Sequence, residues 1–269
     1  MDQEGSPRSG APPRSHTTAP WKASYERRSE DVPQVHQDSR CRASACPQAA
    51  SACVAAPRDR YLDGALSECG GICRDAGTEV APSGKVAGEG YAYWLQRSWQ
   101  IALKSPPPGP QVCETVTVNR QQVALLTVGA AAPGKYNHTC NEPAGRPIYV
   151  QQLSDECSTF PGDHNGFGTT PSQLERCARV MFKGAAATAS VDGHSVADFS
   201  RFITATRVYP VHVPKHNLFN YRQRDGRSAA YGYGLLLSGL RTVEHTILLD
   251  GNVPSAKYQI QVTYTLHVH

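Results

Sequence analysis

Apolar and polar residues alternate most regularly near the C-terminal end of the chain. From Tyr258 to Val268 every second residue is apolar, and the residues between them are Gln, Thr and His. Successive side chains of an extended strand point to opposite faces, so this pattern predicts a strand with one buried and one solvated face. Shorter runs rich in β-branched and aromatic residues have a similar character. They predict further strands over residues 112–118, 122–128, 147–153, 187–191, 199–205, 207–213, 229–237 and 243–249.

Two other segments follow the helical period. Aromatic and aliphatic residues recur every three or four positions over residues 91–103. The prolines at 106–108 then end this helix, because proline has no amide hydrogen to donate. A second helix is predicted to begin after Thr170, which forms a capping box with Gln173, and to end at Gly184.

Roughly eight strands separated by turns, together with two short helices, predict a mainly β fold. We expect residues 86–269 to form an antiparallel β-sandwich with a jelly-roll-like arrangement. Residues 1–85 are rich in Ser, Pro, Arg and Ala and have few Val, Ile or Leu. Such a segment buries too little apolar surface to offset the entropy of ordering its backbone, so it is predicted to be disordered. Our hypothesis for its origin is a mis-called gene start or an unusual leader.

Nine cysteines are many for a cytosolic protein of this length, and they form no zinc-type pair of C-x2-C units. A disulfide framework in an oxidising compartment is favoured, although residues 1–10 lack the apolar core of a signal peptide. The four cysteines after residue 86 allow three pairings. We favour Cys113–Cys140 and Cys157–Cys177, each stabilising the fold by roughly 3 kcal/mol. The five earlier cysteines fit a small disulfide knot, a metal site, or incidental residues in an unselected stretch.

The formal net charge of +4 is small, and Lys and Arg are scattered along the sequence. A nucleic-acid-binding surface needs clustered basic residues, so we expect no nucleic-acid partner. No stretch approaches the roughly 20 apolar residues of a membrane-spanning helix, so we expect no membrane span. The sequon Asn-His-Thr at Asn137 fits an extracytosolic compartment but is short enough to occur by chance.

Seven short motifs occur in order along the second part of the chain. They lie at residues 99–106 (Trp-Gln-Ile-Ala-Leu-Lys-Ser-Pro), 139–146 (Thr-Cys-Asn-Glu-Pro-Ala-Gly-Arg), 176–178 (Arg-Cys-Ala), 191–196 (Val-Asp-Gly-His-Ser-Val), 213–217 (Val-Pro-Lys-His-Asn), 231–233 (Tyr-Gly-Tyr) and 244–247 (Glu-His-Thr-Ile). In this order they resemble a family of uncharacterised secreted bacterial proteins, many labelled only "signal protein". The resemblance covers about residues 86–269. It implies export and a β-sandwich, and it supplies no catalytic residues.

The sequence contains no G-x-S-x-G, no H-E-x-x-H and no phosphate-binding glycine loop. A loop is predicted over residues 155–170, where Gly, Asp, Asn and Pro are dense. Its first part, residues 155–165, gathers acids, a histidine and glycines. Asp163 and His164 are therefore candidates for acid–base chemistry or for holding a metal ion. Solvated turn residues are the alternative interpretation.

Three further histidines are candidates for chemistry. His245 aligns with the apolar residues of its strand, which favours a core histidine bound to a backbone carbonyl over a catalytic base. His267 and His269 form an H-x-H pair, a spacing that can chelate a metal. The pair lies at the end of the chain without an acidic third ligand nearby in sequence. No cofactor is predicted.

The leading functional hypothesis is an extracellular binding or interaction module without catalysis, whose ligand or protein partner the sequence does not identify. It follows from the lack of a convergent catalytic set. The alternative is a small extracellular enzyme, hydrolytic or metal-assisted, that uses the 155–165 loop and a sheet histidine.

Overall fold

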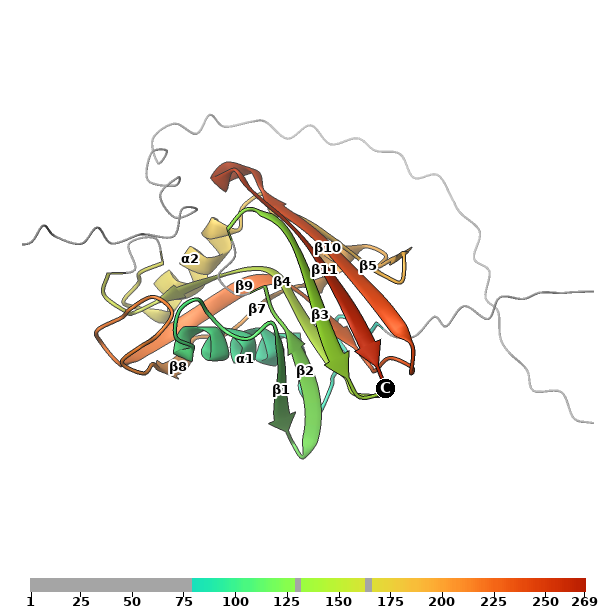
Figure 1. The fold of residues 1–269 in the computed structure, drawn as a ribbon. Helices are drawn as coiled ribbons and strands as arrows, with labels where there is room; N and C mark the ends of the chain where they lie inside the picture. The colour runs from blue at the N-terminus through green and yellow to red at the C-terminus, as the bar shows by residue number, and fades with distance from the viewer. Residues whose placement is uncertain (1–78, 129–131, 163–165) are drawn as a thin grey trace, which may run out of the picture. The chain divides into compact units, whose positions relative to one another are not determined.

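The computed structural model describes residues 79–128, 132–162 and 166–269 as two β-sheets with two α-helices (Figure 1). The larger sheet has the strand order β1 (Cys113–Val118), β2 (Gln121–Leu126), β4 (Ile148–Ser158), β9 (Asp225–Leu237) and β7 (Ile203–Ala205), with β8 (Tyr209–His212) also paired to β9. The smaller sheet has the order β3 (Gly134–Glu142), β11 (Tyr258–Val268), β10 (Glu244–Val253), β5 (Ala186–Val191) and β6 (His194–Ser195). The helices are α1 (Tyr91–Lys104) and α2 (Pro171–Met181), and short 3-10 turns span Phe199–Phe202 and Pro254–Ala256. The predicted mainly β sandwich with two helices is confirmed.

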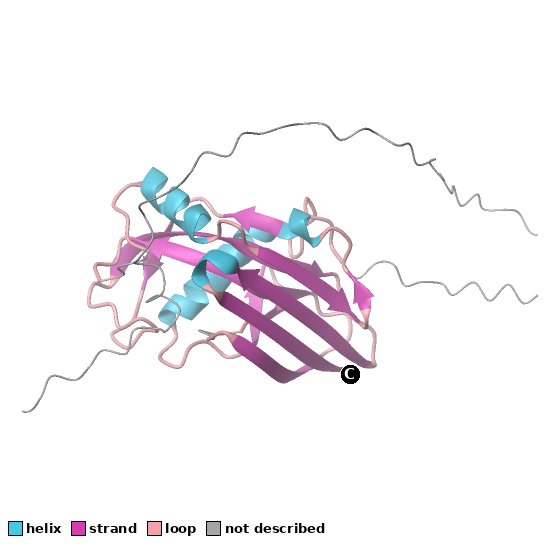
Figure 2. Cartoon of the chain, turned by 90° about the horizontal axis from the view of Figure 1, so that it is seen from above, coloured by secondary structure: helices cyan, strands magenta, loops and turns pink. Residues whose placement is uncertain are grey.

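The two sheets differ in how much of their surface is covered. Nearly every residue of β4 is buried, because the smaller sheet packs on one face of the larger sheet and the helices pack on the other. The smaller sheet keeps an open outer face, so buried residues alternate with exposed or half-buried ones along β10 and with mostly half-buried ones along β11. The alternation of β11 was predicted from the sequence. In Figure 2 these long strands lie side by side, next to the C-terminus.

Two strand pairs are parallel, β2 with β4 and β3 with β11, so the expectation of a wholly antiparallel sandwich is wrong for them. The cause is β3, a strand that the sequence analysis missed. The chain leaves the larger sheet after β2, forms β3 at the edge of the smaller sheet, and returns as β4 beside β2 in the same direction. The β3 segment carries Lys, Asn, His and Thr, which conceals its alternation.

Two predicted boundaries also change. Strand β4 continues to Ser158, so Asp155 and Glu156 belong to the sheet and not to the predicted loop. They pair with Tyr231 and Ala230 of β9, and this ladder keeps the polar segment extended. The predicted strand over 199–205 begins as a 3-10 turn and becomes extended only at Ile203.

The described chain begins before residue 86. The amide of Val80 donates to the carbonyl of Leu236 at 2.8 Å, and the Tyr91 hydroxyl donates to the carbonyl of Val80 at 2.5 Å. The segment from residue 79 therefore packs on β9. The rest of the segment predicted to be disordered, residues 1–78, lies outside the described residues. The five early cysteines belong to it.

Helix α1 covers the larger sheet through fully buried side chains that include Trp94. The Trp94 ring stacks on Tyr149 of β4, with 6.3 Å between ring centres. Gly234 of β9 lies against that tyrosine ring, where a β-carbon would overlap it. Gly232 faces an irregularity in the ladder between Gln151 and Ser154. The glycines of this strand therefore serve close packing.

Both disulfides join separate elements. Cys113 of β1 is bonded to Cys140 of β3, which connects the edges of the two sheets. Cys157 of β4 is bonded to Cys177, which connects the larger sheet to α2. These are the pairings that the sequence analysis favoured. They indicate an oxidising environment, because reducing compartments keep thiols free.

Candidate functional site

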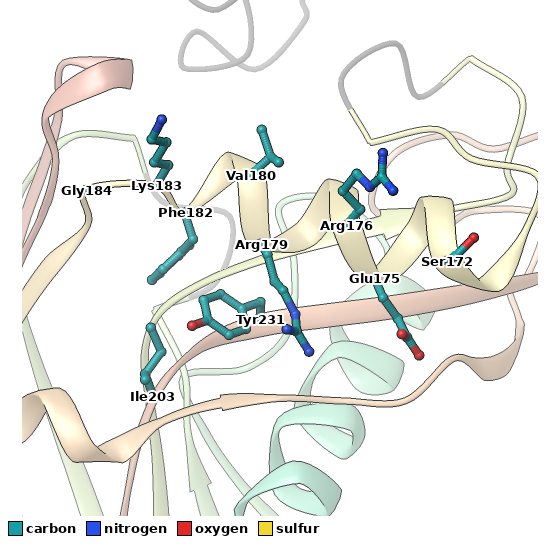
Figure 3. A pocket seen from close by; sticks show the side chains of 10 residues that line it. All are labelled: Ser172, Glu175, Arg176, Arg179, Val180, Phe182, Lys183, Gly184, Ile203 and Tyr231. Atoms are coloured by element: carbon teal, nitrogen blue, oxygen red, sulfur yellow. The ribbon is translucent and has the colours of Figure 1, made fainter. Parts of the chain in front are cut away.

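A shallow hollow of about 640 Å³ runs along helix α2 where the helix faces β7 and β9 (Figure 3). Its walls come from segments far apart in the sequence, and we call it the α2 groove. The lining residues are Ser172, Glu175, Arg176, Arg179, Val180, Phe182, Lys183, Gly184, Ile203 and Tyr231.

Local sequence fixes where α2 begins. The Thr170 hydroxyl accepts a hydrogen bond from the Gln173 amide at 3.3 Å. The Gln173 side chain accepts in return from the amides of Thr170 at 3.1 Å and Thr169 at 2.9 Å. The predicted capping box is therefore confirmed, and the first amides of the helix already have partners.

The buried face of α2 determines which side chains reach the groove. Leu174 and Ala178 pack with Cys157 and Ala229 of the larger sheet. Because residues three and four positions apart share one face of a helix, this packing leaves the charged residues of α2 on the remaining faces. Helix packing and the Cys157–Cys177 bond thus hold the basic side chains in place.

Aromatic rings form the floor of the α2 groove. The guanidinium carbon of Arg179 lies 5.8 Å from the centre of the Tyr231 ring, a cation–π distance. Phe182 meets the same ring edge to face, with 5.8 Å between centres and an interplanar angle of 86°. Figure 3 shows Arg179 and Glu175 directed towards the strands, whereas Arg176, Val180 and Lys183 point away from them.

The groove is electropositive. Its lining contains three cations, Arg176, Arg179 and Lys183, against the single carboxylate of Glu175. Within the described ranges, none of these three cationic side chains has an ion pair or a hydrogen bond. Arg176 and Lys183 can therefore contact a ligand without first breaking an interaction with a described residue, whereas Arg179 already lies over the Tyr231 ring.

The net positive charge of the described residues comes from the stretch of sequence that runs from just before α2 to Tyr231. Between residues 166 and 231 there are nine Lys and Arg but four Asp and Glu, whereas the other described residues contain eight of each kind. Lys and Arg are therefore less evenly scattered than they seemed from the whole chain.

Apolar exposure occurs beside the groove as well. Val180 is 47% exposed, and Phe167, just before α2, is 48% exposed. Among the described residues, the other large hydrophobic residues of comparable exposure are Val243 and Leu248 of the β10 region.

The predicted 155–165 loop does not form one exposed cluster. Asp163 and His164 lie outside the described residues. Glu156 is buried in β4, where Ser228 donates to its carboxylate and also bonds the Tyr209 hydroxyl at 3.2 Å. Burial raises the pKa of Tyr209 well above its usual value, and the nearby Glu156 carboxylate raises it further. This cluster lies inside the protein.

His245 is 7% exposed and uses both ring nitrogens. Its Nδ1 lies 2.7 Å from Oδ2 of Asp192, and its Nε2 lies 3.0 Å from the carbonyl oxygen of Arg241. A carboxylate and a carbonyl both accept hydrogen bonds, so each ring nitrogen lies opposite an acceptor. These are the contacts that the interpretation as a core histidine requires.

Of the two histidines at the end of the chain, His267 lies near one carboxylate, and neither belongs to a larger group of possible metal ligands in the described residues. His267 Nδ1 lies 3.4 Å from Oε2 of Glu244, and both side chains are at least half exposed. The His269 amide donates to the Glu142 carbonyl at 3.1 Å. Across the described ranges, no group of three or more His, Cys, Asp or Glu side chains is placed to hold a metal ion. The same residues contain no helix with the length and apolar composition needed to cross a bilayer.

Sequence reasoning missed the α2 groove because it searched for acids, histidines and known motifs. The spacing of Arg176, Arg179 and Lys183 beside an apolar stripe on α2 was visible. The sequence did not reveal the floor of the groove, because Tyr231 and Ile203 are brought beside the helix only by the assembly of the sheet.

Comparison with known proteins assigns no family. No family model matches the chain, and no curated protein matches it. Among solved structures, PbICP-C in complex with falcipain-2 is similar at 8% identity, covering 54% of this chain and 98% of that chain with a TM-score of 0.22. The solution structure of amebosin is similar at 15% identity, covering 51% of this chain and 100% of that chain with a TM-score of 0.19. TM-scores this low carry no inference about function.

Proposed function

We propose that this protein is a non-catalytic binding module that recognises an anionic ligand through the α2 groove. The observation that carries the proposal is a set of three cations beside an aromatic floor, Arg176, Arg179 and Lys183, which have no ion pair with any described residue. A cation that is paired with a carboxylate must be released before it binds one in a ligand, and within the described residues these three are not paired in this way.

The groove suits binding better than catalysis. Its lining includes no histidine and no cysteine, and its one carboxylate, Glu175, has no basic partner at ion-pair distance in the described residues. An acid–base or nucleophilic site needs such groups within hydrogen-bonding distance of one another. The enzyme alternative depends on Asp163 and His164, so no observation in the described residues favours it.

We further propose that the protein acts outside the cytosol, as do the secreted bacterial proteins that its motifs resemble. The two disulfides support this, since each closes a loop that would stay open in a reducing compartment. Thiol titration of the protein isolated from its natural source without reductant tests the proposal. Free thiols at the four bonded positions would contradict it.

Binding is tested by NMR titration of the oxidised full chain with two anions, hexaglutamate and a sulfated hexasaccharide. We expect shift changes at residues 172–184 for at least one of them, and weaker binding at high salt because exposed charges are screened. The variant Arg176→Ala/Arg179→Ala/Lys183→Ala should lose this binding.

The matched control is Lys85→Ala/Lys104→Ala/Lys135→Ala, which removes three exposed cations outside the groove-forming segments. It should bind as the wild type does. Equal loss in both variants would show that net charge alone matters, and shift changes confined to the smaller sheet would place the site elsewhere. Either result would refute the proposal.

A further inference from the structure

We infer that the ligand of the α2 groove is an extended acidic peptide segment of a protein partner, with an apolar side chain between its carboxylates. This inference rests on the proposed function and names the partner's chemistry. It is argued from charge complementarity, from the contacts that the Tyr231 ring already makes, and from the apolar exposure beside the cations.

The aromatic floor favours a peptide over a sugar. Carbohydrate binding would use an aromatic ring with an open face on which a sugar ring can stack. In the groove, Arg179 already lies over Tyr231, and Phe182 meets the same ring edge to face. The guanidinium held there offers donors arranged to match a carboxylate.

Apolar exposure between the cations also points to a peptide. Val180 lies one helical turn after Arg176 and three residues before Lys183, and all three point away from the strands in Figure 3. A valine that is 47% exposed gains little from a sulfated chain, whereas an apolar side chain of a peptide would cover it. On this outward side of the α2 groove, an apolar residue therefore lies between two cations.

The length of the groove sets the length of the segment. The helical part of its lining extends from Ser172 to Val180, eight residues along the chain, which corresponds to about 12 Å at the rise of a helix, and the lining continues through the turn to Gly184. An extended peptide advances about 3.3 Å per residue, so about four residues span the helical part and a hexapeptide also reaches the turn. Shorter peptides should lose contacts at one end of the groove.

The test is fluorescence anisotropy of the oxidised full chain with a labelled hexapeptide, acetyl-Glu-Asp-Leu-Asp-Glu-Glu-amide. Comparison ligands are the same peptide with Ser in place of Leu, the trimer acetyl-Asp-Leu-Asp-amide from its centre, and the sulfated hexasaccharide. We expect the hexapeptide to bind most tightly. Replacing Leu by Ser should weaken binding about fivefold, and so should Val180→Ser, since each removes one apolar contact. Removing the three cations should weaken it about tenfold or more.

Circular dichroism and urea unfolding establish that Val180→Ser remains folded, and Val243→Ser on the other sheet is its matched control. Tight binding of the sulfated hexasaccharide without peptide binding would refute the peptide inference and leave the proposed function standing. Equal affinity for the Leu and Ser peptides would also refute the inference. Absence of binding to every anion would refute both.

Discussion

Replacing Arg146 by Met should strongly destabilise the sandwich. Arg146 follows β3 and connects the two sheets. Its Nη1 donates to Glu142 Oε2 and to Thr115 Oγ1, each at 3.0 Å, and its Nη2 donates to Gln122 Oε1 at 2.8 Å. The side chain of Glu142 is only 4% exposed, and that of Arg146 is 16% exposed. The substitution would therefore leave a buried carboxylate without its cation.

The magnitude follows from that burial. Removing one partner of a buried ion pair costs about 3–5 kcal/mol, because the remaining charge is desolvated and uncompensated. Since Arg146 keeps some contact with solvent, we expect about 3 kcal/mol at pH 7. With a urea m-value of about 2–3 kcal/mol/M, the midpoint should fall by about 1–1.5 M. The double variant Arg146→Met/Glu142→Gln should recover most of the loss, since no charge remains to desolvate.

The pH dependence gives an independent check. Burial raises the pKa of Glu142 above its ordinary value of 4.5, while the hydrogen bond and charge of Arg146 lower it. In the Arg146→Met variant this pKa rises further. A raised carboxyl pKa gives a contribution to stability that is present below pH 4.5 and is lost as the pH rises through the folded pKa.

The deficit of Arg146→Met relative to the wild type should therefore be large at pH 7 and small near pH 4. Urea unfolding, which adds no salt, measures it at both values. A loss below about 1 kcal/mol at pH 7, a loss independent of pH, or a double variant no more stable than the single one would refute the reasoning.

Three further predictions concern the fold. Replacing Cys113 and Cys140 by Ser opens a 27-residue loop and should cost about 3 kcal/mol in urea unfolding, with reductant lowering the wild-type melting temperature; an unchanged midpoint would contradict it. His245→Phe removes the bonds to Asp192 and to a carbonyl and should cost about 2 kcal/mol, measured by the same assay; no change would exclude the structural role. Gly234→Ala places a methyl group against a buried tyrosine ring and should cost about 1–3 kcal/mol, whereas a stabilised variant would show that the ring has room to move.

Elements were predicted correctly from the sequence where their pattern of apolar and polar residues depends on one simple environment. Strand β11 has one buried and one open face, so its alternation is clean. Helix α2 carries its own start signal in the capping box, and that signal acts locally. Strand β3 was missed because it is an edge strand with polar residues on its open face, and its pairing with β11 is decided by a strand more than 100 residues later.

The extension of β4 was missed for a related reason. Asp155 and Glu156 are polar residues of a kind that favours loops, and only the ladder with β9 keeps them in the sheet. Burial of Glu156 is tolerated because Ser228 donates a hydrogen bond to it, and Ser228 lies 72 residues further along the chain. A local pattern carries no information about such a partner.

The candidate site depends on the same long-range assembly. Because helices cover one face of the larger sheet, that sheet offers little open surface, and the groove arises where α2 leaves part of β9 uncovered. Strand β9 supplies Ala229 to the core beneath the helix and Tyr231 to the groove floor two residues later. The core contact, the capping box and the bond between Cys157 and Cys177 together fix the helix on the strand. Arg179 is thus held over its ring before any ligand arrives, and a preorganised cation loses less conformational entropy on binding than a free one.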